Sequence, residues 1–162
     1  MTLEELNAQD RAAFVSAVGW VFEQSAWIAE RAWNRRPFAS LGDLHGAMIS
    51  QVRSATLDEQ LGLLRAHPDL GTRAALSSAS AAEQSGAGFD RMTAAESERF
   101  SALNAAYRDK FGFPFIYAVR SGAKHDILNA LESRLLSDRE AERGEALEQV
   151  FRIARFRLED VL

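Results

Sequence analysis

Apolar residues recur at helical spacing along most of this chain. In the first long run, Phe14, Val18, Phe22 and Ile28 lie four to six residues apart. Similar patterns return in the ranges 41–52, 57–64, 100–111, 127–135 and 147–161. A spacing of three or four residues places side chains on one face of a helix. No alternating pattern typical of strands persists, so the sequence predicts an all-α fold.

Helix starts are indicated by capping boxes, in which Ser or Thr precedes Glu by three residues. The pairs are Thr2–Glu5, Thr56–Glu59, Ser80–Glu83, Thr93–Glu96 and Ser137–Glu140. Asp10 and Ser40 are two further candidate caps, and Pro37 and Pro68 end the helices that precede them. We therefore expect a single-domain helical bundle of about eight helices over residues 1–162.

Two stretches interrupt this helical pattern, His67–Gln84 and Lys110–Arg120. Each contains a proline, and residues 71–79 between the predicted helices are small and predict a loop. The residues from Phe115 to Val119 favour a strand by propensity. Because there is no second strand to pair with them, we expect an irregular or helical segment. Such breaks are suited to the wall of a pocket.

Composition narrows the class of protein. The chain has 162 residues, 47% of them hydrophobic and 26% charged, which is ordinary for a globular domain. It has no cysteine, which excludes disulfides and thiolate metal sites. A net charge of -4 argues against nucleic-acid binding. No apolar run is long enough for a membrane span, and the first residues do not resemble a signal peptide. We expect a cytoplasmic enzyme or adaptor.

His67 is the first candidate for chemistry, because an imidazole can give or take a proton near neutral pH. The alternative is a histidine that ends a helix and complements its dipole. Pro68 restricts the backbone next to the ring, and Asp69 can either orient the ring or cap a turn. No pair of histidines has metal-ligand spacing, so we expect no metal.

Glu83 is the second candidate. If a helix begins near Ser80, then Ser80, Glu83 and Gln84 share one face that offers a hydroxyl, a carboxylate and an amide. The alternative is that Glu83 only completes a capping box with Ser80. Local sequence leaves both interpretations open.

Two further features have the same double interpretation. The break from Gly112 to Phe115 can present backbone groups beside aromatic walls, or it can be a turn between core helices. Arg157 in the last helix can bind a carboxylate or a urea-like oxygen, or it can be a solvated helical arginine.

The ordered set of motifs resembles 2-oxo-4-hydroxy-4-carboxy-5-ureidoimidazoline (OHCU) decarboxylase, an enzyme of the urate-to-allantoin pathway. Each motif alone is weak, but the set covers nearly the whole chain. The principal matches are His67-Pro68-Asp69-Leu70, Ser80-x-x-Glu83-Gln84 and Lys110-Phe111-Gly112-Phe113-Pro114-Phe115-Ile116. Supporting matches are Phe22-Glu23-x-Ser25-x-Trp27, Ala87-Gly88-Phe89-Asp90, Leu103-Asn104-x-x-Tyr107, Arg134-Leu135 and Arg157-Leu158. The chain departs from the family pattern at Gln24 and Ala26, and at Gly71-Thr72.

The resemblance implies a cofactor-independent, all-helical carboxy-lyase that is usually a homodimer and acts on the small molecule OHCU. It makes His67 the catalytic histidine and Glu83 the second essential group. It also implies a set of residues that hold or line the substrate: Pro68, Ser80, Gln84, Phe113, Phe115, Ile116 and Arg157. The alternative is a catalytically silent relative that only binds a ligand or a partner protein.

Overall fold

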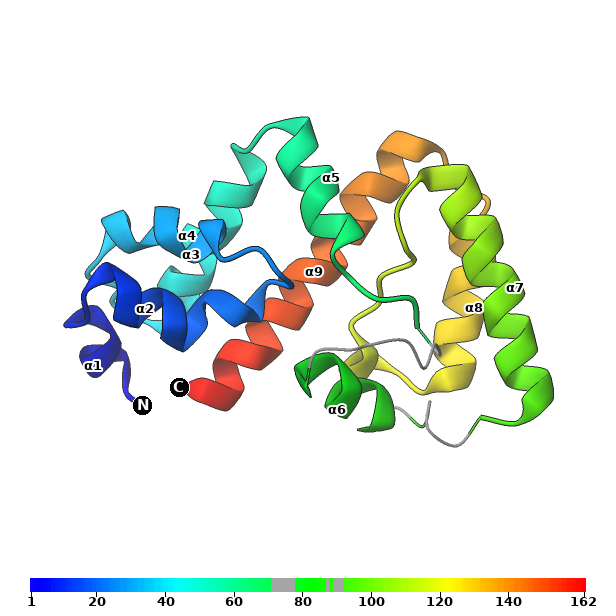
Figure 1. The fold of residues 1–162 in the computed structure, drawn as a ribbon, viewed down its shortest axis with the longest axis horizontal. Coiled ribbons are helices and arrows are strands. Elements are labelled where there is room, and N and C mark those ends of the chain that lie inside the picture. The colour runs from blue at the N-terminus through cyan, green and yellow to red at the C-terminus, as the bar shows by residue number, and fades with distance from the viewer. Residues whose placement is uncertain (71–77, 87, 89–91) are drawn as a thin grey trace. The chain divides into compact units, whose positions relative to one another are not determined.

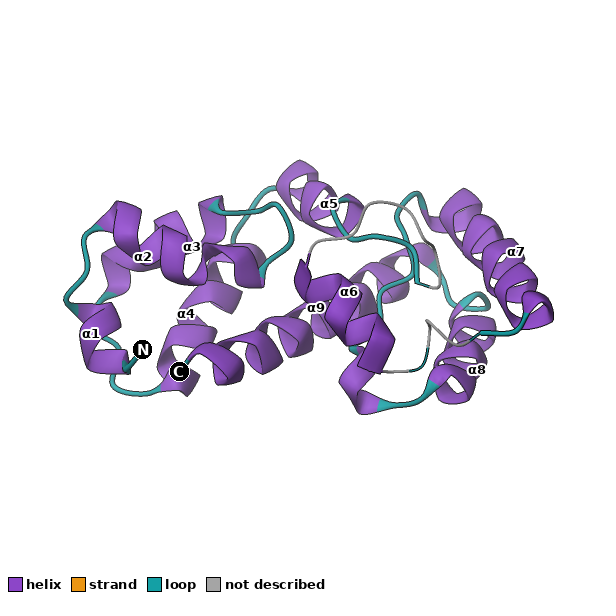
Figure 2. Cartoon of the chain, turned by 60° about the horizontal axis from the view of Figure 1, so that its bottom comes forward, coloured by secondary structure: helices purple, strands orange, loops and turns teal. Residues whose placement is uncertain are grey.

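The computed structural model describes residues 1–70, 78–86, 88 and 92–162. These residues form α-helices joined by loops and short 3-10 turns, with no strand among them (Figures 1 and 2). The helices are α1 (Leu3–Asn7), α2 (Arg11–Val18), α3 (Trp27–Ala32), α4 (Leu41–Arg53), α5 (Leu57–Arg65), α6 (Ser78–Gly86), α7 (Ala94–Phe111), α8 (Lys124–Arg134) and α9 (Arg139–Val161). The 3-10 turns are Gly19–Val21, Trp33–Arg35 and Val119–Ser121. The all-α prediction is therefore confirmed, and none of the described helices is long and apolar enough to cross a membrane.

Most predicted helix starts are confirmed. Thr2, Thr56 and Thr93 each accept a hydrogen bond from the backbone N–H of the glutamate three residues on, and the carboxylate of that glutamate accepts one from the backbone N–H of the threonine. Asp10 and Ser40 cap α2 and α4. These caps are local in sequence, so a local pattern is sufficient to find them.

Two predicted caps are wrong. Ser80 is the third residue of α6, which begins at Ser78, so it lies inside the helix. In α9 the side chain of Asp138, and not that of Ser137, accepts a hydrogen bond from the backbone of Ala141 at 2.8 Å. A neighbouring residue with equal capping strength therefore displaced the serine. The loop predicted for residues 71–79 lies mostly outside the described residues, and the last two of these belong to α6.

The chain divides into two compact units, and the first comprises residues 1–66 and 151–162. Within it α3 packs against α2 and α4. The first long apolar run is divided between two helices, because α2 is followed by a 3-10 turn and Gln24 adopts a φ of 45° before α3 begins. Its core consists of apolar side chains that include Leu6, Phe14, Val18, Phe22, Ile28, Leu44, Met48, Val52, Leu63, Leu64, Ala154 and Leu158.

The second unit comprises residues 67–150 and contains α6, α7, α8 and the first half of α9. Gly112 ends α7 with a φ of 79°, a left-handed conformation that favours glycine. The chain from Phe113 to Ala118 is then irregular, as predicted. Its core includes Phe100, Tyr107, Phe111, Phe113, Phe115, Ile116, Ile127, Leu131, Ala146 and Val150. The single-domain organisation expected from the length stays a prediction.

Candidate active site

His67 lies in a short loop that follows α5. The helix ends at Arg65 with Ala66 as its C-cap, and the imidazole beyond it is only 6% exposed. A histidine that merely complements a helix dipole has no need to leave water, so burial weakens that alternative. The structure therefore favours a specific role for this ring over a solvated helix end.

The His67 loop is held by α7. The side-chain amide of Asn104 donates to the carbonyl of Leu70 at 2.7 Å, and Asn104 is itself buried. The guanidinium of Arg108 pairs with Asp69 at 3.0 Å. Asp69 therefore pairs with an arginine of α7. The sequence had suggested that Asp69 either orients the His67 ring or caps a turn, and neither interpretation included this pair. These contacts hold the loop at the side chain of Asp69 and at the backbone of Leu70.

The polar face of α6 matches the sequence prediction. Ser80 and Gln84 are buried, at 5% and 6% exposure, while Glu83 on the same face is partly exposed. Because Ser80 lies inside the helix, Glu83 is not the capping-box partner of Ser80. The face thus carries three hydrogen-bonding groups of different chemistry, and α6 packs against the turn Val119–Ser121.

The apolar segment, Phe113–Ala118, is the third part of the site. Phe113, Phe115 and Ile116 are all buried. The ring of Tyr107 lies 5.9 Å from that of Phe113 and 5.4 Å from that of Phe115, in edge-on geometry. The two phenylalanines therefore contribute to the core, and their contact with a substrate stays a prediction. Together, α7 holds the His67 loop through Asn104 and contacts the apolar segment through Tyr107.

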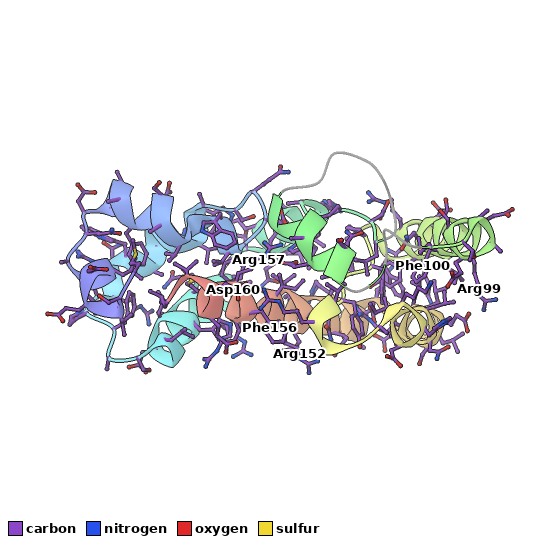
Figure 3. All side chains as sticks on the ribbon, turned by 90° about the horizontal axis from the view of Figure 1, so that it is seen from below. Arg99, Phe100, Arg152, Phe156, Arg157 and Asp160 are labelled. Carbon is purple, nitrogen blue, oxygen red and sulfur yellow. The ribbon has the colours of Figure 1, made fainter. Side chains whose placement is uncertain are left out.

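Arg157 lies on the C-terminal half of α9, in the first unit (Figure 3). It is 2% exposed, and its Nη2 atom lies 2.9 Å from a carboxylate oxygen of Glu23, which is 5% exposed. The backbone oxygens of Val21 and Trp20 lie 3.4 and 3.5 Å from Nη1. The alternative of a solvated helical arginine is wrong, because this guanidinium is buried and paired. Its contact with a substrate stays a prediction.

Comparison with known proteins decides the family. The family model for OHCU decarboxylase matches residues 7–159. The 2-oxo-4-hydroxy-4-carboxy-5-ureidoimidazoline decarboxylase of Halalkalicoccus jeotgali is 47% identical over 161 residues, which cover 99% of this chain and 92% of the relative. This chain belongs to the OHCU decarboxylase family. Membership confirms the resemblance and the expected class of enzyme, a carboxy-lyase.

Two other relatives place the family domain in longer proteins. The uric acid degradation bifunctional protein of Bacillus subtilis is 46% identical, and the match covers 99% of this chain but 33% of that protein. The crystal structure of an (S)-allantoin synthase superposes on this chain with a TM-score of 0.82 and 37% sequence identity. The match covers 100% of this chain and 54% of the allantoin synthase chain. The OHCU decarboxylase fold therefore occurs both alone and as part of larger chains.

Several polar residues of this OHCU decarboxylase family member were assigned no role from sequence, although Tyr107 and Arg134 stand in the supporting motifs. Tyr107, Arg134 and Glu142 form a buried network in the second unit, and Gln149 bonds the backbone of Ala118 at 2.9 Å. Glutamate and arginine inside amphipathic helices usually face water, so composition gave no signal for them. Among the residues that the structure describes, no group of three or more acidic or histidine side chains could hold a metal ion.

Proposed function

We propose that this chain converts OHCU to (S)-allantoin without a cofactor, with His67 and Glu83 as its proton-handling groups. The observation that carries the assignment of His67 is its burial in a loop that Asn104 bonds at the backbone of Leu70 and Arg108 bonds at the side chain of Asp69. A catalytic acid or base must be held in one geometry, and such a loop supplies it. The names of two relatives, an OHCU decarboxylase and an (S)-allantoin synthase, support the substrate and the product.

The chemistry needs proton transfer and no external electron sink. Cleavage of the bond to the carboxylate releases CO2 and leaves an electron pair on the ring carbon. The neighbouring C=N bond of the substrate can accept that pair, and the enol-like intermediate is then protonated on one face. One group manages the proton of the substrate hydroxyl and another delivers a proton to carbon. His67 and Glu83 provide these two functions, in either assignment.

The remaining residues bind and orient the substrate in this proposal. Ser80 and Gln84 offer a hydroxyl and an amide from the buried face of α6. Pro68 and the side chains of Phe113, Phe115 and Ile116 line the pocket and exclude water. Apolar walls disfavour the charged carboxylate ground state relative to the charge-dispersed transition state. Arg157 contacts the ureido or ring oxygen, because tight binding of the departing carboxylate would not speed its loss.

A homodimer and a cytoplasmic location also belong to this proposal. The resemblance to the family supports the homodimer, and the composition of the chain supports the cytoplasmic location. Sedimentation of the wild-type protein at several concentrations tests the dimer. A species with the mass of one chain throughout would reject it.

The deciding experiment compares wild type with His67→Asn. Freshly generated OHCU is supplied to protein dialysed against a chelator, and (S)-allantoin is followed by circular dichroism. We expect wild-type turnover and a fall of at least ~100-fold in the variant, because proton transfer contributes at least that factor. Affinity for (S)-allantoin, measured by titration calorimetry, should stay close to the wild-type value, since asparagine keeps a hydrogen-bonding amide.

Three outcomes would count against the proposal. A wild-type protein that binds allantoin but does not turn over OHCU would be a catalytically silent relative. Substantial turnover by folded His67→Asn would remove the ring from the chemistry. An equal loss of affinity and turnover would make His67 a binding residue.

A further inference from the structure

The apolar segment lacks a regular hydrogen-bonding partner along its length. Its residues Phe113–Ala118 are neither helix nor strand, yet most of them are buried. Backbone polar groups that are buried must be bonded, or each costs several kcal/mol. Side chains of α8 and α9 supply two of these bonds. Arg134 donates to the carbonyl of Ile116 at 2.7 Å, and Gln149 accepts from the amide of Ala118 at 2.9 Å.

Other contacts of Arg134 orient its guanidinium toward the carbonyl of Ile116. Its Nε atom donates to a carboxylate oxygen of Glu142 at 2.6 Å, and its guanidinium lies 4.5 Å from the centre of the Phe115 ring. Glu142 is 1% exposed and also accepts a hydrogen bond from the hydroxyl of Tyr107. Burial, with this bond to Glu142, raises the pKa of the Tyr107 hydroxyl well above its usual value, so it stays a donor.

Gln149, which lies further along α9, is also held by a second partner. Its side-chain nitrogen donates to Glu145 at 2.8 Å, which leaves its oxygen directed at the amide of Ala118. Gln149 is 4% exposed, so water does not compete strongly for either group. The carbonyl of Ile116 and the amide of Ala118 therefore stand on either side of Tyr117, and each is bonded to a side chain that a second hydrogen bond also holds.

We propose that Arg134, oriented by Glu142 and Tyr107, and Gln149 are positioning residues that fix the backbone of Ile116–Ala118 for substrate binding. The inference rests on the proposed function of the apolar segment as a pocket wall. A buried ion pair is weak evidence for stability, since apolar residues of similar volume often stabilise as well. What apolar residues cannot do is hold two particular backbone groups of an irregular segment in one conformation.

The test uses the pair Gln149 and Glu145, because their roles can be exchanged. Gln149→Leu removes the acceptor for Ala118 and keeps a similar volume. The double variant Gln149→Glu with Glu145→Gln restores an oxygen at the first position and a donor at the second, with net charge unchanged. We expect Gln149→Leu to lower kcat/KM by ~10–100-fold, mainly through KM, since a misplacement of about 1 Å can cost ~100-fold. The exchanged pair should recover most of this loss.

A second variant and a control separate positioning from general stability. Arg134→Lys keeps the charge but lacks the planar fork that reaches Glu142 and Ile116 together, so we expect the same rise in KM. Arg99→Ala breaks an exposed pair with Glu132 in the same unit, at 58% and 38% exposure, and should change neither KM nor kcat. All kinetics are measured below the lowest melting temperature, where each variant is folded.

Hydrogen exchange gives a readout that does not need turnover. The amide of Ala118 should be protected in wild type and in the exchanged pair, and should exchange at least ~10-fold faster in Gln149→Leu, because the loss of ~1.4 kcal/mol of protection is a factor of ten. Loss of this protection in Gln149→Leu, together with a protected wild type that does not turn over OHCU, would leave the positioning role standing while the proposed function fails. Folded Gln149→Leu and Arg134→Lys with kcat and KM within about threefold of wild type would overturn the positioning role.

Discussion

The buried pair of Arg157 and Glu23 makes a prediction whose magnitude follows from its geometry. The two residues are 134 positions apart, both are almost fully buried, and their closest atoms are 2.9 Å apart. Glu23→Leu removes the carboxylate and keeps a similar side-chain volume. It leaves the guanidinium of Arg157 buried without this carboxylate, while the backbone oxygens of Val21 and Trp20 remain at 3.4 and 3.5 Å.

The expected cost is large for one substitution. Removal of one partner of a buried ion pair costs ~3–5 kcal/mol. The two long contacts with backbone oxygens give the cation partial compensation, so we expect the lower end, ~3 kcal/mol, out of a total stability of ~5–15 kcal/mol. For a chain of this length, ~1 kcal/mol corresponds to ~2–4 °C in Tm, which gives a fall of ~6–12 °C.

A double variant identifies the cause. If the loss comes from an uncompensated charge, Glu23→Leu combined with Arg157→Met should recover most of it, because apolar replacement of both partners is often neutral. Urea and thermal unfolding followed by circular dichroism measure the stability of wild type, Glu23→Leu and the double variant. The matched control is Glu159→Leu, which breaks the exposed pair with Arg155 on the same helix, at 46% and 42% exposure, and should cost at most ~1 kcal/mol.

Either of two results would refute this reasoning. One is a cost below ~1 kcal/mol for Glu23→Leu, which would mean that the pair is not desolvated. The other is a double variant that is less stable than Glu23→Leu. The same double variant also tests the proposed substrate contact, since a folded protein without Arg157 should then have a raised KM.

Two further predictions concern single groups. Glu83→Gln should reduce turnover by ~100-fold or more while changing stability by at most ~1 kcal/mol, and near-normal turnover in the allantoin assay would reject its proton-handling role. His45 donates to the carbonyl of Phe151 at 2.8 Å, and burial lowers its pKa from 6.5. The unfolded chain then binds the proton more readily, so stability should fall as pH drops below ~6.5. His45→Gln should flatten that fall in urea unfolding curves, and an unchanged pH dependence would exclude His45.

Local patterns in the sequence were sufficient for much of the fold. Thr56 and Thr93 were found as caps because a capping box lies within four residues and depends on little else. The break after Gly112 was found because glycine and proline restrict the backbone by themselves. Ser80 and Ser137 failed as caps for an equally local reason, since α6 begins two residues earlier and Asp138 competes successfully with its neighbour.

Long-range polar partners could not be predicted in this way. Helical periodicity shows that a face is buried, but it does not say which group from another helix meets it. Tyr107 and Glu142 are 35 residues apart, and Arg134 lies between them in sequence. Each is a common residue of a solvated or apolar helix face, so nothing in its neighbourhood distinguishes it. Asn104, Tyr107 and Arg134 were marked only through the resemblance, which named no partner for any of them.

The arrangement of polar residues on α7 explains how two distant stretches of sequence keep a fixed spacing. Asn104, Tyr107 and Arg108 are three and four residues apart, so they lie on one face of the helix. Asn104 and Arg108 bond the His67 loop, and Tyr107 contacts Phe113 and Phe115. Because a helix rises ~1.5 Å per residue, these attachment points lie within ~6 Å along its axis. The distance between the imidazole loop and the apolar segment is therefore set by one rigid element. A site built in this way loses less conformational entropy on binding than one whose two parts are held only by their own loops.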